Sequence, residues 1–170
     1  GDIIGVFDPG IFSIGDTICT PGKKFRFGGI PTFAPEHFSR VSPRDSMKRK
    51  QFIKGTEQIA QEGAIQIFKL PNSGMEEVIV GVVGTLQFDV FQYRMKSEYG
   101  VDLRMEGLPY EHLRFIAKSP VEDLKDLNLS SDVELLEDYR GHSLLVFSSL
   151  WSIDYTIKRN PGLELSETLN

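Results

Sequence analysis

A stretch of twenty residues in the middle of the chain, Val82–Val101, contains a complete set of helix signals. It reads Val-Val-Gly-Thr-Leu-Gln-Phe-Asp-Val-Phe-Gln-Tyr-Arg-Met-Lys-Ser-Glu-Tyr-Gly-Val. Gly84 tolerates backbone conformations that a β-carbon resists, Thr85 can cap the free N–H groups of a helix, and Gly100 can end that helix in the left-handed conformation. The sequence therefore predicts a strand end, a turn and a helix over Leu86–Tyr99.

The segments on either side of this helix alternate between strand and helix patterns. The predicted strands cover 37–41, 64–69, 78–83 and 101–105, and a first helix begins at a cap on Asp45 or Ser46 and runs to about Gln61. The resulting order is β-α-β-β-α-β. This order is typical of the ferredoxin-like fold, so we expect an α+β domain.

The last third of the chain has the pattern of a second α/β half that extends this domain to residue 170. Strands are predicted over 113–117, 132–136 and 143–147, with a last edge strand over 163–165. Ser119-Pro120-Val121-Glu122 has the pattern of a helix start, and a helix over Leu150–Arg159 is followed by Asn160-Pro161-Gly162. Residues 86–103 and 150–165 share a faint similarity, which we interpret as common strand–helix–strand cues and not as a true repeat.

Residues 1–35 have a different pattern, made of short extended segments and turns. Candidate strands are Asp2–Phe7, Thr17–Cys19 and Lys24–Phe27, and prolines at 31 and 35 stiffen the connector that follows. We interpret the strands as part of a β-barrel, which is too little to close a barrel by itself. The first residues have no signal-peptide pattern and no Met, which we interpret as the interior of a longer protein.

The two later helices each have two apolar sides. At 100° per residue, Leu86, Val90 and Tyr93 lie on one side of their helix, and Phe88, Phe91 and Met95 lie on the other. The last helix likewise has one stripe of Leu150, Ile153 and Ile157 and a second of Trp151 and Tyr155. We expect the halves before and after about residue 107 to pack together so that each covers the other's second stripe. A partner-binding apolar face is the alternative.

Positive charge is concentrated in one segment. The chain has a net charge of −5, whereas residues 40–54 carry six cations against Asp45 alone, a net charge of +5. Those cations are the candidate contacts to an anionic partner such as RNA: Arg40, Arg44, Lys48, Arg49, Lys50 and Lys54. Lys50 and Lys54 fall on the outward side of the predicted first helix, opposite Phe52 and Ile59, where they can contact phosphates. A solvated helix face is the alternative interpretation.

The sequence lacks the motifs of common catalytic and cofactor sites. No Gly-x-x-x-x-Gly-Lys-Ser/Thr loop occurs, and the glycines at 81 and 84 are typical of strand packing or a turn. His37, His112 and His142 are scattered, and Cys19 is the single cysteine, so no metal-ligand spacing and no internal disulfide arises. We expect no catalytic, cofactor-binding or metal-binding residues in this chain.

Composition favours a soluble protein. Hydrophobic residues make up 40% of the chain and charged residues 25%, and the longest apolar runs, 78–83 and 144–147, are far too short to cross a bilayer. We therefore expect no membrane partner. A single thiol fits a reducing cytoplasm.

Several stretches of this sequence resemble the release factor 3 family of translational GTPases. The central run Val-Gly-Thr-Leu-Gln-Phe-Asp-Val sits where that family has Val-Gly-x-Leu-Gln-Phe-Asp-Val, in its third domain. Elongation factor G, a related family, usually reads Gly-Glu-Leu-His-Leu-Glu there. Further similar stretches are Gly-Asp-Ile-Ile-Gly at 1–5, Ile-Gly-Asp-Thr at 14–17, Phe-Gly-Gly-Ile-Pro-Thr-Phe-Ala-Pro-Glu at 27–36, Lys-Gly at 54–55, Glu-Gly-Ala at 62–64 and Gln-Ile-Phe at 66–68.

This resemblance implies a fold and a function. It implies that residues 1–35 are the closing strands of a domain II-like β-barrel with its connector, and that residues 36–170 are the domain III-like α+β domain. It implies a ribosome-docking region that relays the state of an absent G domain, which would bind GTP or GDP with Mg²⁺. The implied partners are small-subunit RNA and protein of the ribosome and, indirectly, the class I release factors, whose recycling the family promotes.

Three alternatives remain open from the residues alone. An RNA-recognition module shares the β-α-β-β-α-β order, although the predicted third strand, 78–83, lacks the aromatics on which bases stack. A domain III of the elongation factor G type has the same order. A small-molecule regulatory or enzymatic domain would need a pocket of convergent polar groups.

Overall fold

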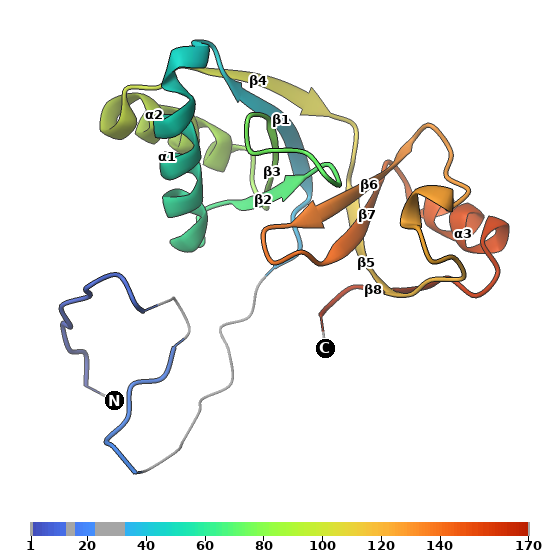
Figure 1. The fold of residues 1–170 in the computed structure, drawn as a ribbon, viewed down its shortest axis with the longest axis horizontal. Coiled ribbons are helices and arrows are strands. Elements are labelled where there is room, and N and C mark those ends of the chain that lie inside the picture. The colour runs from blue at the N-terminus through green and yellow to red at the C-terminus, as the bar shows by residue number, and fades with distance from the viewer. Residues whose placement is uncertain (1, 13–15, 23–32, 170) are drawn as a thin grey trace.

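The computed structural model describes residues 2–12, 16–22 and 33–169. The described chain contains α-helices, β-strands and two short 3₁₀ helices (Figure 1). In chain order they are β1 (His37–Pro43), η1 (Ser46–Lys48), α1 (Arg49–Gln61), β2 (Gln66–Lys69), β3 (Val78–Val82), α2 (Leu86–Tyr99), β4 (Leu103–Leu108), β5 (His112–Lys118), η2 (Leu124–Asp126), β6 (Val133–Asp138), β7 (Ser143–Phe147), α3 (Leu150–Arg159) and β8 (Glu164–Ser166). The predicted α+β class is confirmed, and the bounds predicted for α2, β7 and α3 agree with the structure. No helix among the described residues is long and apolar enough to span a bilayer.

All eight strands form one antiparallel sheet in the order β4-β1-β3-β2-β6-β7-β5-β8. The first four strands have the order 4-1-3-2, which the ferredoxin-like fold requires, so this prediction is confirmed. The two halves join where β2 pairs with β6, through Phe68 opposite Asp138 and Lys69 opposite Glu137. A short edge pairing thus makes one sheet out of two.

The second half repeats the strand order of the first. Numbered from β5, its strands also lie in the order 4-1-3-2, and the segment that contains η2 takes the place of the first helix. The weak similarity between residues 86–103 and 150–165 thus accompanies a shared topology. Two units of equal connectivity meet through their equivalent strands, β2 and β6.

The helix predicted from Ser119 does not form. A continuing helix would direct the Lys125 N–H to the carbonyl of Val121, but the Asp123 carboxylate accepts this N–H at 3.0 Å. The Val121 carbonyl instead accepts from the Ser119 hydroxyl at 2.8 Å. These local side-chain bonds satisfy the backbone without a helix, and only η2 remains.

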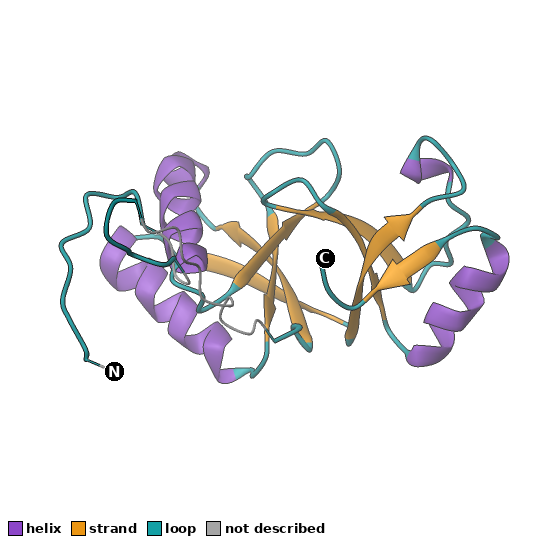
Figure 2. Ribbon diagram, turned by 90° about the horizontal axis from the view of Figure 1, so that it is seen from below, coloured by secondary structure: helices purple, strands orange, loops and turns teal. Residues whose placement is uncertain are grey.

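The halves pack face to face, with the helices outside (Figure 2). The helices α1 and α2 cover one face of the first half, and α3 covers the outer face of the second half. The two helix-free faces meet in an apolar cluster of Phe38, Phe68, Ile79, Leu113, Leu136, Leu144 and Val146. Because Ile79 faces this cluster while Val78 and Val80 face the helices, all of β3 is buried.

The expectation that each half covers the second stripe of the other's helix is therefore wrong. On α2, Phe91 and Met95 are buried, but Leu86 and Tyr93 are each 72% exposed. On α3, Trp151 is 67% exposed. A helix in an outer layer can bury only the side that faces its own sheet, so the sheet faces and not the helices join the halves.

The two ends of α2 differ in how well the sequence predicted them. Gly100 adopts φ 66° and its N–H bonds to the Lys96 carbonyl, so the left-handed helix end is confirmed. The predicted Thr85 cap is wrong, because the threonine has helical dihedrals and makes no capping bond. Instead the Gln87 side chain accepts from the N–H groups of residues 83 and 84, at 2.9 and 3.3 Å. The glycine at 84 does not adopt a positive φ.

Residues 2–12 and 16–22 contain no strand, although strands were predicted at 2–7 and 17–19. The strand predicted at 24–27 lies outside the described residues. Asp8 forms a turn in this segment: its carboxylate accepts from the backbone N–H groups of Gly10, Ile11 and Phe12. These hydrogen bonds lower the pKa of Asp8, and the bond from Gly10 contributes most. The assignment of residues 1–35 to a β-barrel stays a prediction.

A carboxylate and serines fix the start of α3. The Ser149 hydroxyl accepts from the Ser152 N–H at 3.2 Å, and the Asp132 carboxylate accepts from the hydroxyls of Ser130, Ser148 and Ser152. These bonds, with Ser130 contributing most, lower the pKa of Asp132 to about 2. The carboxylate thereby ties the β5–β6 connection to the first turn of α3.

Replacing Leu136 by Ala tests the contact between the halves. Leu136 is fully buried in the apolar cluster, so we expect a loss of about 2 to 5 kcal/mol in the free energy of unfolding. Leu150→Ala is the matched control, since this leucine is 61% exposed and its truncation should change stability by about 0.5 kcal/mol or less. Denaturant unfolding measures both; equal losses would contradict the packing described.

Replacing Asp132 by Asn tests the α3 anchor through pH. The pKa of the folded state lies below the ordinary value of 3.8, so the carboxylate stabilises the fold above about pH 4 and this contribution fades as pH falls toward 2. We expect the melting temperature of the variant to lie below that of the native chain at pH 6, and we expect this difference in melting temperature to narrow toward pH 2.5. A gap independent of pH would show that the charge is not responsible.

Candidate nucleic-acid interface

The six cations predicted as contacts divide into two groups by residue type. The three arginines have partners within the chain: Arg40 Nε lies 3.3 Å from Glu77 Oε1, Arg44 Nε donates to the Leu103 carbonyl at 3.0 Å, and Arg49 Nη2 lies 2.5 Å from Glu76 Oε1. A guanidinium has several fixed donors and can serve the fold in this way. The arginines therefore help to hold β1, α1 and their neighbours in place.

The three lysines have no partner among the described residues. Lys48, Lys50 and Lys54 make no ion pair and no side-chain hydrogen bond there, and Lys50 and Lys54 are exposed. Lys50 and Lys54 stand one turn apart on α1 and are exposed, while Phe52 and Ile59 are buried beneath them, as predicted. Positive charges at this spacing repel each other weakly, so a bound anion would reduce the repulsion between the two lysines.

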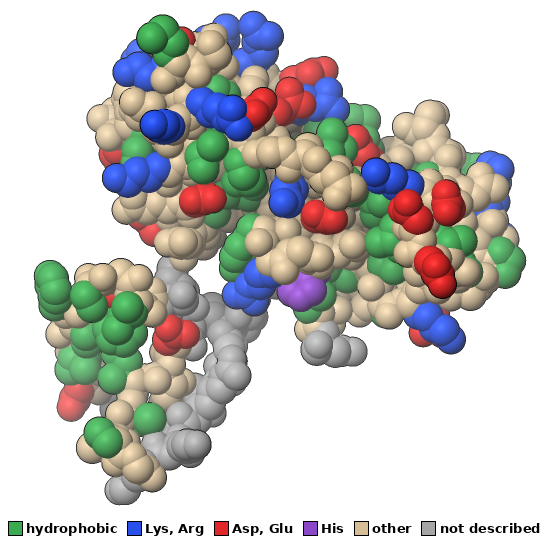
Figure 3. Space-filling model, in the orientation of Figure 1, with side chains coloured by type: hydrophobic (Ala, Val, Ile, Leu, Met, Phe, Trp, Pro, Cys, Tyr) green, Lys and Arg blue, Asp and Glu red, His purple; other side chains and the backbone are tan. Residues whose placement is uncertain are grey.

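The set is also split between two faces of the sheet. Val41 packs beneath the helices, so Arg40, next to it in β1, points to the opposite face, because neighbouring residues of a strand alternate. Its salt bridges to residues 77 and 106 lie on that face. We therefore define the lysine face as Lys48, Lys50 and Lys54, on η1 and α1. Figure 3 shows Lys and Arg side chains gathered over this lobe of the molecule.

Contacts with α2 hold the lysine face rigidly. The first contact is steric: a β-carbon on Gly55 would lie 2.7 Å from Tyr99 Cδ2, so only glycine lets the two helices approach this closely. The second is ionic, since Arg94 bridges Glu62 at the end of α1 and Glu98 on its own helix. The hydrogen bond from Arg94 lowers the pKa of Glu62 and so favours its charged form.

Sequence reasoning missed one exposed cation, Arg104 on β4. It lies opposite Ser42 of β1 and makes no ion pair or side-chain bond among the described residues. Acidic neighbours at 102 and 106 hide it in any count of charge along the sequence. Only the pairing of β1 with β4 brings it next to the basic segment.

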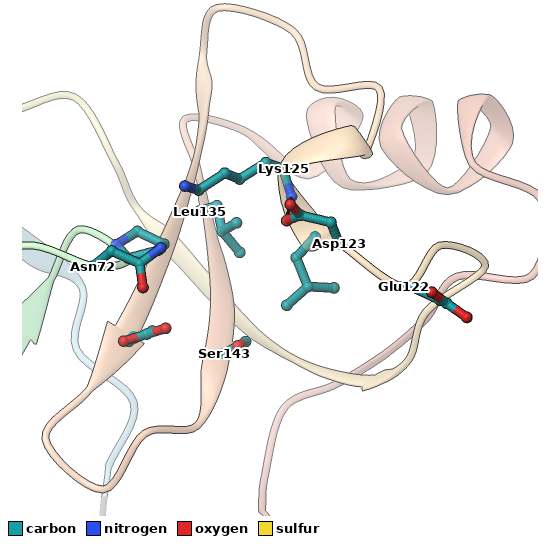
Figure 4. A pocket seen from close by; sticks show the side chains of 9 residues that line it. Asn72, Glu122, Asp123, Lys125, Leu135 and Ser143 are labelled. Carbon is teal, nitrogen blue, oxygen red and sulfur yellow. Dashed lines mark hydrogen bonds between the residues drawn. The ribbon is translucent and has the colours of Figure 1, made fainter.

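Two hollows on the described part of the chain have the size of small-molecule sites. The groove in Figure 4, about 410 Å³, lies between η2 and the β6–β7 hairpin; Lys125 and Asp123 stand at its rim and Glu122 points away from it. A hollow of about 820 Å³ is lined by residues 34–39 and 107–114. His37 and His112 line this second hollow, whereas His142 binds Asp138 in the β6–β7 turn at 2.8 Å. In the described part of the chain, no His, Cys, Asp or Glu cluster is arranged to hold a metal.

The sheet surface that an RNA-recognition module would use is covered. In the first half, that helix-free face carries Phe38 and Phe68, and both are 2% exposed beneath the second half. Bases cannot stack on these rings. The structure therefore leaves helices and loops as the surfaces for a nucleic acid.

A family model described as the C-terminal domain of class II release factor RF3 matches residues 27–157. This match spans most of the chain and includes β1 to β7 and the lysine face. The chain belongs to this release factor 3 family. The predicted resemblance is thereby confirmed.

Individual relatives agree with the family match. The chain is 47% identical over 163 residues to a peptide chain release factor 3 of Symbiobacterium thermophilum, covering 96% of the chain and 30% of that relative. It is 41% identical to proteins of the same name from Gloeobacter violaceus, over 167 residues, and Listeria welshimeri, over 169 residues. These matches cover 98% and 99% of the chain and 31% of each relative. The chain thus spans about a third of the length of these release factor 3 proteins.

Proposed function

We propose that this chain is the ribosome-docking C-terminal region of a translation-termination GTPase that promotes recycling of the codon-reading class I release factors. Its relatives are named peptide chain release factor 3, and the family match covers most of the chain. In this proposal a G domain elsewhere in the parent protein binds GTP or GDP with Mg²⁺ in the cytoplasm. The chain contacts small-subunit RNA and protein.

The lysine face is the observation that carries this proposal. Among the described residues, Lys50 and Lys54 are exposed and unpaired on a helix fixed by α2, whereas the neighbouring arginines are bound within the fold. Flexible lysine side chains on a rigid helix suit phosphates, which they position without reading a base sequence. Each phosphate contact releases counterions, so binding should weaken steeply with salt.

To transmit the nucleotide state of a G domain, this chain must also move as one rigid body. The continuous sheet and the buried cluster between the halves fit this need, since a displacement at one end is carried to the other. Allostery further requires that docking differ between the two nucleotide states, because a contact of equal strength in both shifts nothing. In this proposal the lysine face supplies the state-dependent contact.

Two of the alternatives are less well supported. The covered sheet face disfavours an RNA-recognition module, and the match to the release factor 3 family model disfavours a domain III of the elongation factor G type. The groove between η2 and the β6–β7 hairpin gives little support to a small-molecule domain, since Lys125 and Asp123 stand at its rim and Glu122 points away from it.

Charge reversal on α1 tests the proposed interface. We expect Lys50→Glu/Lys54→Glu to weaken association of this chain with ribosomes at low salt and to flatten its salt dependence, because phosphate contacts are lost. The free energy of unfolding should change by no more than about 0.5 kcal/mol, as both side chains are exposed. Pelleting with ribosomes at about 50 and about 200 mM salt measures the first effect, and thermal melting the second.

Lys118→Glu/Lys125→Glu is the matched control, with the same charge change at exposed sites of the second half. Lys118 reaches only Glu164, at 4.0 Å, and such exposed pairs contribute little. This control should bind ribosomes as the native chain does. Equal weakening by both double variants would leave net charge as the cause and remove the lysine face from the interface.

A further inference from the structure

Three flat side chains form a ladder on the outer surface of α3. Trp151 and Tyr155 stack with their ring centroids 4.8 Å apart and their planes 16° from parallel. The Arg159 guanidinium carbon lies 5.3 Å from the centre of the Tyr155 ring, and its Nη1 donates to the Tyr155 hydroxyl at 3.1 Å. The spacing i, i+4, i+8 places all three on one side of the helix.

The ladder is held on a helix that is fixed from its other side. Thr156 is buried, and its hydroxyl donates to the Ser152 carbonyl at 2.7 Å. The Asn160 side chain is also buried; it accepts from the Asn128 N–H at 2.7 Å and donates to the Asn128 carbonyl at 3.0 Å. The helix therefore presents the ladder as a preformed surface.

Folding does not account for the outermost ring. Trp151 is 67% exposed, and Tyr155 stacks on it, so an open indole sits at the end of a stack. Lys158 and Arg159 provide two cations in the last turn, against the single acid Asp154 on the helix. An open aromatic face next to cations complements a base joined to a phosphate.

We propose that Trp151, Tyr155 and Arg159 form a stacking platform for unpaired nucleobases of RNA, with Lys158 and Arg159 close to the phosphates. This inference rests on the proposed function, which supplies RNA as the partner, and adds a second contact to the lysine face. The two surfaces lie at opposite ends of the molecule, since α3 and α1 cover different halves (Figures 1 and 2). The stacked rings of Trp151 and Tyr155 stand next to the cations of the last turn, and this pairing favours RNA, because a base can stack on the indole while its phosphate meets a cation.

The ladder can be tested directly because Trp151 is the only tryptophan in the chain. We expect a ten-nucleotide single-stranded oligoadenylate to quench its fluorescence in a saturable manner, since a base stacked on the indole quenches it. A duplex of the same length should quench little, because its bases are not available. Absence of saturable quenching by the single strand would overturn the proposal.

Variants distinguish stacking from general attraction to RNA. The anisotropy of a labelled oligoadenylate measures its binding. Trp151→Ala should weaken this binding roughly 5-fold to 100-fold, the range for loss of one base–aromatic stack. Trp151→Phe should retain most of the affinity, because a phenyl ring can still stack on a base. Tyr93→Ala is the matched control, because Tyr93 is 72% exposed on α2 and has no ring partner among the described residues. Equal affinity of Trp151→Ala and the native chain would overturn the platform.

Failure of the platform and failure of the docking proposal remain distinguishable. If Lys50→Glu/Lys54→Glu loses ribosome binding while Trp151→Ala keeps it and the oligonucleotide does not quench, the docking proposal stands and the platform falls. If oligoadenylate quenches Trp151 but neither set of variants affects ribosome binding, the platform stands as an RNA site and the docking proposal falls. If Trp151→Ala weakens ribosome binding without any quenching by RNA, the surface meets a ribosomal protein and the RNA platform is overturned.

Discussion

The mutual burial of two helix-free sheet faces determines most of this structure. The β2–β6 pairing alone is short, with two residue pairs between the halves. The apolar cluster behind it, which includes Phe38, Ile79 and Leu136, removes a much larger area from water and fixes how the halves face each other. Because each half offers its bare face to the other, the helices are left on the two outer sides of the molecule.

This arrangement decides which surfaces can meet a partner. The inner sheet faces, which present rings in other proteins of this topology, are closed. What stays open is the outer side of each helix: lysines on α1, apolar residues such as Leu86 and Tyr93 on α2, and the Trp151 ladder on α3. The interaction surfaces of the chain are thus a consequence of how its core closes.

The division of labour between arginine and lysine follows from their chemistry. Arg40, Arg44 and Arg94 each hold carboxylates or carbonyls from other segments, which a planar guanidinium with fixed donors does well. Lys50 and Lys54 lie near Arg40 and Arg44 in the sequence, yet they extend from α1 into solvent. A count of positive charge along the chain treats both kinds alike, whereas within the described part of the basic segment the lysines, and not the arginines, are available to an external anion.

The sequence by itself determined the elements and the topology of the first half, since hydrophobic periodicity and the Gly100 helix end are local signals. It also determined the family and the outward direction of Lys50 and Lys54. It failed at Ser119 and Thr85, because other local groups satisfy the backbone there: the Asp123 carboxylate accepts from the Lys125 N–H, and the carbonyls of residues 84 and 85 accept from the N–H groups of residues 87 and 88. Only the tertiary structure decided how the halves join, which arginines are engaged and which helix sides stay bare, because these depend on contacts between residues far apart in the chain, and no local pattern encodes them.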